Sequence, residues 1–245
     1  MSYLIATLLI GLVIPVALFF PSRHRITIML AGAIELLHSP PVIVFNDVYW
    51  NPPRMGGGSW GLEDLILSFG LGAGVWAAAI APLHSRLRYS FAPRRVIIRL
   101  LCVGLPPVAL ALGVREAGVS VMTNLLIVML ATGAVLALLQ PRLLRLSAAG
   151  VLIYPPYYLA VLFLCGWLID GFFAIWSGPE LWGIRIVGFP IEEIIFVYLF
   201  SFCYPLIIGT VLSAQIIERP RDAPTYSALP TASQPAPHSI STGES

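Results

Sequence analysis

The chain has 245 residues, of which 58% are hydrophobic and only 11% are charged, and its formal net charge is +2. Soluble domains are about one-quarter charged, so this composition excludes a water-soluble globular protein. The small net charge also argues against a nucleic-acid partner, because such proteins carry concentrated basic patches. We therefore expect an integral membrane protein.

Seven apolar segments are long enough to cross a hydrocarbon core of about 30 Å. In chain order they are 3–20, 26–45, 62–83, 96–112, 119–139, 147–169 and 190–217. The first segment lacks the basic start and cleavage site of a signal peptide, so we keep it as a span. The sequence thus predicts an all-α protein with seven transmembrane helices.

Proline pairs interrupt this apolar pattern at 40–41, 106–107 and 155–156, each inside a predicted span. Proline lacks the backbone N–H donor, so each pair is expected to kink or interrupt its helix.

The basic residues indicate an orientation. All 14 are arginines, and eleven of them fall in loops on one side of the membrane if the N-terminus lies outside. Only Arg54, Arg115 and Arg185 then fall outside, which agrees with the positive-inside rule. The segment 218–245 is rich in Pro, Ser, Thr and Ala and is expected to be a disordered cytoplasmic tail.

Two pairs of adjacent acidic residues open apolar helices: Glu63-Asp64 and Glu192-Glu193. Ionisable groups at the edge of a bilayer are costly, so each pair is a candidate functional site. Each pair follows a loop that contains Trp, Pro and Gly, and an Asp precedes both loops. This repeated order predicts two parallel three-helix repeats, 1–95 and 119–217, joined by a connecting helix at 96–118.

Acidic side chains in such a position can perform acid catalysis. Neighbouring residues on a helix point about 100° apart, so one carboxyl of a pair acts while the other supports it or caps the helix. Asp170, at the end of the sixth span, and Asp47, beyond the second span, are candidate partners. A protonated carboxyl in an apolar pocket can protonate an alkene, and aromatic faces can hold the cation that results.

Six aromatic residues lie near the acids in the sequence and are candidates for substrate binding. They are Trp50, Trp60, Trp176, Trp182, Phe189 and Phe196. The alternative is that they form the ordinary aromatic belt at the membrane surface.

The pattern of Asp170, Trp176, Gly183 or Gly188 and Phe-Pro-Ile-Glu-Glu-x-x-Phe at 189–196 resembles the lycopene cyclase domain of heterodimeric and fused carotenoid cyclases. The stretch from Trp50 to Asp64 looks like the corresponding element of the first repeat. The resemblance implies cyclisation of lycopene-like ψ-ends to β- or ε-rings, without metal or other cofactor. It implies Glu192 or Glu193 as proton donor and Asp170 as its partner, with Glu63 and Asp64 in these roles in the first repeat.

Other functions stay open at this point. A membrane terpene cyclase acting on another prenylated or polyene substrate would use the same acids. A small proton-coupled transporter also suits seven helices with buried carboxyls such as Glu35. A retinal protein is excluded because the chain contains no lysine. The substrate is expected to reach the protein from the bilayer, and homo- or hetero-oligomerisation is left open.

Overall fold

The structure is a computed structural model that describes residues 2–12, 16–38, 40–46, 48–90 and 92–217. Seven α-helices lie in this part of the chain. They are α1 (Ser2–Gly11), α3 (Ser22–Glu35), α4 (Leu62–Ile80), α5 (Pro93–Glu116), α6 (Val121–Leu139), α7 (Leu144–Leu168) and α8 (Ile191–Val211). The prediction of an all-α fold is confirmed, whereas the predicted tail at 218–245 lies outside the described residues.

Among the described residues, five helical segments are long and apolar enough to cross a membrane. They are Leu62–Arg86, Pro93–Glu116, Val121–Leu139, Pro141–Leu168 and Ile191–Val211. The first of these joins α4 to a 3₁₀ helix, η4 (Ala81–Arg86), and the fourth joins η5 (Pro141–Leu143) to α7. These five correspond to five of the seven predicted spans.

The remaining two predicted spans, 3–20 and 26–45, are not single α-helices. The first comprises α1 and the short 3₁₀ helix η1 (Ala17–Phe19), and the second comprises α3 followed by η2 (Leu36–His38) and η3 (Pro40–Phe45). In the second, the α-helix has already ended at Glu35, and Pro40-Pro41 cannot donate the N–H groups that an α-helix would need there.

The other proline pairs behave differently. Pro106-Pro107 lies inside α5 and Pro155-Pro156 inside α7, and both helices are assigned continuously across them. Neither pair therefore interrupts its helix, whereas in the second predicted span the α-helix ends at Glu35, before Pro40-Pro41.

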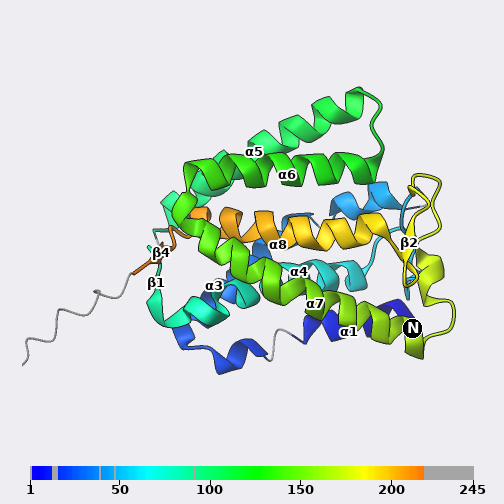
Figure 1. The fold of residues 1–245 in the computed structure, drawn as a ribbon, viewed down its shortest axis with the longest axis horizontal. Helices are drawn as coiled ribbons and strands as arrows, with labels where there is room; N and C mark the ends of the chain where they lie inside the picture. Colours follow the sequence, from blue (N-terminus) through cyan, green and yellow to red (C-terminus); the bar gives the residue numbers. More distant parts are fainter. Residues whose placement is uncertain (1, 13–15, 39, 47, 91, 218–245) are drawn as a thin grey trace, which may run out of the picture.

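Two helices form the centre of the bundle (Figure 1). Helix α4 packs against α1, α3 and α7, and helix α8 packs against α6 and α7. The contact of α4 with α3 is close, because a Cβ atom at Gly72 would meet the Ala31 carbonyl and the Glu35 side chain. Helix α5 is peripheral and has no buried residue among those described.

Each end of the bundle carries a short pair of β-strands, one between distant segments and one within a local hairpin. At one end β1 (Leu87–Arg88) pairs with β4 (Gln215–Ile216). At the other end lie the N-terminus and an antiparallel hairpin of β2 (Arg185–Ile186) and β3 (Phe189–Pro190) (Figure 1). Because α4 and α8 both start at the end that carries the hairpin, the two acidic pairs lie at the same end of the molecule.

Candidate active site

The second acidic pair occupies the first turn of α8, directly after the hairpin. Val187 and Gly188, at the hairpin turn, have φ values of 52° and 90°, so the chain reverses sharply before α8 begins. Glu192 is fully buried and Glu193 is 6% exposed. The local fold thus places two carboxyls inside the protein at the start of an apolar helix.

Glu193 accepts hydrogen bonds from three side chains that come from three separate segments. The Tyr49 hydroxyl donates to Oε2 at 2.9 Å, the Tyr158 hydroxyl to Oε1 at 2.6 Å, and the Trp176 indole N–H to Oε2 at 3.1 Å. All three donors are buried and none carries a charge. Burial, followed by the charge and hydrogen bond of Glu193, raises the pKa of the Tyr49 phenol well above its ordinary value. Tyr49 therefore keeps its proton and acts as a donor.

Glu192 points to a different neighbourhood, as expected for adjacent helix positions. Its Oε1 accepts a hydrogen bond from the backbone N–H of Trp182, whose indole N–H donates to Thr123 of α6 at 3.2 Å. Its Oε2 is buried and has no hydrogen-bond partner among the described residues. Glu192 therefore joins α8 to the loop before it, whereas Glu193 faces the interior of the bundle.

The first acidic pair has a different chemical environment. Arg54 donates from Nε to Asp64 Oδ2 at 2.6 Å and from Nη2 to Oδ1 at 3.1 Å. Both side chains are almost inaccessible, at 1% and 0% exposure. The Tyr3 hydroxyl also donates to Oδ1 at 2.8 Å, and the Gly61 backbone N–H donates to Oδ2 at 2.8 Å. Asp64 is thus held by a buried, bidentate ion pair, whereas Glu193 has no ion pair within the part of the chain that the structure describes.

Glu63 completes this cluster through the backbone. Its Oε1 accepts a hydrogen bond of 2.7 Å from the Met55 N–H. The carboxyls of both Glu63 and Asp64 therefore bind the loop that precedes α4.

The six aromatic residues that the sequence indicates do not form a single cluster. Trp176 and Phe189 are buried beside Glu193, and Phe189 makes edge-to-face contacts with Phe173 and Trp176 at centroid distances of 5.0 and 6.4 Å. Trp50 instead contacts Tyr3 and lies under the Arg54 guanidinium, beside the first acidic pair. Trp60 and Trp182 are exposed at the same end of the molecule.

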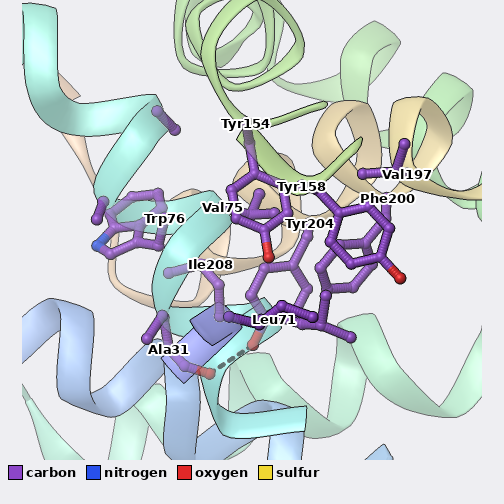
Figure 2. Close-up of a cluster of buried hydrophobic side chains, with 14 of the residues drawn as sticks. Ala31, Leu71, Val75, Trp76, Tyr154, Tyr158, Val197, Phe200, Tyr204 and Ile208 are labelled. Atoms are coloured by element: carbon purple, nitrogen blue, oxygen red, sulfur yellow. Dashed lines mark hydrogen bonds between the residues drawn. The ribbon is translucent and has the colours of Figure 1, made fainter. Parts of the chain in front are cut away.

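Phe196 belongs to a stack along α8. Its ring stacks on Phe200 at 5.7 Å, and Phe200 stacks on Tyr204 at 4.8 Å. Tyr154 and Tyr158 of α7 stack on each other at 6.1 Å and lie next to this row in the bundle interior (Figure 2). Tyr158 thus connects the aromatic interior to Glu193.

Asp170, the predicted partner of the acids, is exposed just beyond the C-terminus of α7. It is not among the three donors to Glu193, and its role stays a prediction. Asp47, a second candidate in the first half, lies outside the described residues.

An apolar groove opens between α7, the hairpin and α8; Glu193 does not line it, but Phe189 does, and the Phe189 ring contacts Trp176, one of the donors to Glu193. The volume of the groove is about 410 Å³, and it is lined by Leu159, Ala160, Phe163, Ile186, Val187, Phe189 and Ile194. No charged or hydrogen-bonding side chain lines it, so it suits a hydrocarbon ligand.

Sequence reasoning missed Tyr49, Tyr158 and Arg54 as parts of the two clusters. Tyr49 lies within the Trp-rich segment that drew attention, but no sequence pattern pairs it with Glu193. The local signal at Tyr158 is a Pro-Pro-Tyr-Tyr run at 155–158, which has no established link to acid chemistry. The sequence shows Arg54 only as one of the three arginines on the outer side of the predicted topology.

Glu193 is thus a buried carboxyl with three neutral hydrogen-bond donors in an aromatic interior. Residues 120–211 match the family model for lycopene cyclase, which confirms the resemblance for the second half of the chain. This segment contains α6, α7 and α8 and thus includes Tyr158, Trp176 and Glu193. No curated protein and no solved structure matches the chain.

The family match has two consequences. It covers 92 of the 245 residues, and together with the apolar helices it supports an integral membrane protein. Tyr49 lies outside the matched segment, so the first half of the chain contributes one donor to Glu193.

Proposed function

We propose that the protein catalyses the proton-initiated, redox-neutral cyclisation of linear ψ-end groups of a lycopene-like carotenoid to β- or ε-rings. The observation that carries this proposal is the environment of Glu193, a buried carboxyl with three neutral hydrogen-bond donors. Burial without a paired cation favours the neutral acid, whereas the three donors stabilise the carboxylate that forms when the proton leaves. The neutral acid is the form that can give a proton to an alkene.

The reaction balances without an oxidant or reductant. Glu193 gives its proton to the terminal double bond of the ψ-end, and the resulting cation is attacked by a second double bond, which forms the ring C–C bond. A ring carbon then loses one proton, and a new double bond forms. The product is an isomer of the substrate, and the Glu193 carboxylate is the acceptor that we favour for the returning proton.

The donors of Glu193 serve the charged stage of this reaction. When the proton leaves, Tyr49, Tyr158 and Trp176 donate to the carboxylate that remains. Preorganised donors aimed at a charge that develops in the transition state are among the strongest catalytic devices in enzymes.

Aromatic rings beside the acid suit the cationic intermediate. The faces of Trp176 and Phe189 lie in the same buried cluster, and a cation over an aromatic face gains about 0.5 to 2 kcal/mol. The predicted set of substrate-binding aromatics therefore narrows to these two rings near the acid.

The apolar groove supports a hydrocarbon substrate that arrives from the bilayer. Its volume of about 410 Å³ lies within the range of small-molecule sites. In this proposal the groove holds the part of the polyene adjacent to the end group that reacts.

We retain the two parallel repeats, the external N-terminus and the cytoplasmic C-terminus as proposals. Two observations support the repeats: α4 packs on α1 and α3 as α8 packs on α6 and α7, and both acidic pairs lie at one end. A terpene cyclase for another prenylated or polyene substrate would use the same acid, so the substrate must be tested directly.

The test is pigment analysis in cells that accumulate lycopene. Wild-type protein should produce cyclic carotenoids, and Glu193→Gln should produce none, because the amide keeps the volume of the side chain but cannot supply an acidic proton. Glu116→Gln is the matched control, since Glu116 is exposed at the end of α5. Ring formation by Glu193→Gln at the wild-type level would refute the acid role. Absence of rings with wild-type protein would favour another substrate or a transporter.

A further inference from the structure

The first acidic pair raises the question of whether the chain contains two proton donors or one. Asp64 and Arg54 form a bidentate ion pair with almost no solvent access. Such a pair is stable only while both partners are charged, because loss of either charge leaves the other buried and uncompensated. A carboxylate held in this way has no proton to give.

The ion pair is instead part of a brace for the loop before α4. Arg54 donates from Nη1 to the Asn46 side chain at 3.1 Å, and the Glu63 carboxylate accepts from the Met55 N–H at 2.7 Å. The Arg54 guanidinium also lies over the rings of Tyr3 and Trp50, at 5.8 and 5.6 Å from their centroids. Side-chain contacts therefore bind the loop 46–61 to the first turn of α4, both at Asn46, which precedes Arg54, and at Met55, which follows it.

The same loop carries Tyr49 to Glu193. The Asn51 N–H donates to the Ile175 carbonyl at 2.8 Å, and the Glu180 N–H donates to the Val48 carbonyl at 2.9 Å. Gly178 lies so close to this loop that a Cβ atom at position 178 would collide with the Val48 carbonyl. Between these attachments Tyr49 is only 4% exposed and donates to Glu193 Oε2.

We infer that Arg54 and Asp64 are positioning residues, which hold the loop that presents Tyr49 to Glu193, and that the chain has a single proton donor. The inference rests on the proposed function only for its kinetic part, because the brace itself is a claim about the fold. It replaces the expectation that Glu63 and Asp64 serve as a second acid site.

The kinetic test is a double-mutant cycle. Tyr49→Phe removes one donor to a charged group, so kcat should fall about tenfold or more, with little change in KM. The double variant R54Q/D64N replaces the ion pair with a neutral pair that can still form hydrogen bonds. It should also lower kcat. The triple variant should be no slower than the slower of the two, because Arg54 and Asp64 act through Tyr49.

Two outcomes of this cycle would overturn the inference. If the effects multiply in the triple variant, the first acidic pair acts independently of Tyr49. If Glu193→Gln still forms rings and Asp64→Asn removes that residual activity, Asp64 is a second donor. Arg115→Gln is the matched control, because this side chain is 54% exposed and makes a hydrogen bond of 3.1 Å to the Val119 carbonyl and a long contact of 3.8 Å with Glu180, and neither contact involves the loop before α4.

A second readout does not depend on ring formation. Amide hydrogen exchange across 48–54 should be at least tenfold faster in R54Q/D64N than in wild type or Arg115→Gln. Unchanged protection would overturn the positioning role even if the protein acts on another substrate. Faster exchange in a protein that forms no rings would support the brace and refute only the proposed function.

Discussion

The hydroxyl of Tyr49 donates a 2.9 Å hydrogen bond to Glu193, although the two residues are 144 positions apart in the sequence. This bond joins a loop of the first half of the chain to the helix that carries the acidic motif in the second half. The environment of Glu193 is therefore built by the whole chain, although only residues 120–211 match the lycopene cyclase family.

Tyr158→Phe should slow ring formation with little change in substrate affinity. Tyr158 is the nearest donor to Glu193, at 2.6 Å, and hydrogen bonds to charged groups are worth about 1.5 to 3 kcal/mol. We expect kcat to fall by about ten- to a hundredfold. Tyr157→Phe is the control, because its hydroxyl donates instead to the Leu9 carbonyl. Equal losses in the two variants would contradict a specific role for Tyr158.

Two substitutions at Trp176 separate its two contributions. Trp176→Phe removes the N–H donor but keeps an aromatic face, whereas Trp176→Leu removes both. If the ring stabilises a cation, the leucine variant should be slower than the phenylalanine variant by a further factor of about 2 to 30. Steady-state rates in membranes measure this difference, with Trp167→Phe as an exposed control on α7. Equal rates for the two variants would remove the cation role.

Glu192→Gln should leave most of the activity. The Glu192 Oε1 accepts from the Trp182 N–H, and a glutamine oxygen can do the same. The new amide N–H₂ would replace a buried oxygen that has no partner, so we expect a stability loss of about 1 to 3 kcal/mol. Thermal unfolding in detergent and pigment analysis together check this. A folded Glu192→Gln protein without activity would show that the donor is Glu192 rather than Glu193.

The sequence predicted the helical class, the positions of the five apolar helices and the second acidic motif, because hydropathy and motif spacing are local properties. The proline pairs were less informative, because Pro106-Pro107 and Pro155-Pro156 lie inside continuous helices and α3 ends before Pro40-Pro41. The partners of the acids were not predictable in this way. Whether a carboxyl is joined by Arg54 or by Tyr49 and Tyr158 depends on contacts between segments far apart in the chain. Two motifs that look alike in the sequence, Glu63-Asp64 and Glu192-Glu193, consequently have different environments: Asp64 binds a cation, whereas Glu193 accepts hydrogen bonds from neutral side chains.

A histidine at the other end of the bundle makes stability sensitive to pH. His24, at the start of α3, is fully buried; its Nε2–H donates to the His84 carbonyl and its Nδ1 accepts from the Tyr89 hydroxyl. Burial lowers the pKa of His24 below its ordinary value of 6.5, and the nearby Arg23 acts in the same direction. The unfolded chain therefore binds a proton more readily than the folded protein.

This difference fixes the sign of the pH effect. The stabilisation is complete above about pH 6.5 and is lost as the pH falls below that value. The melting temperature in detergent should therefore decrease more between pH 7 and pH 5 for the wild type than for His24→Gln, which cannot titrate. Parallel pH profiles for the two proteins would contradict the prediction.

The origin of the proton that starts ring closure is tested most directly by a single turnover in heavy water. Protein equilibrated in heavy water and mixed with unlabelled lycopene should yield a product that carries one deuterium per ring, with no change in the total number of hydrogen atoms. Glu193→Gln should yield unchanged lycopene under the same conditions. Rings without deuterium, or a product with fewer hydrogen atoms than lycopene, would contradict a proton-initiated, redox-neutral cyclisation by Glu193.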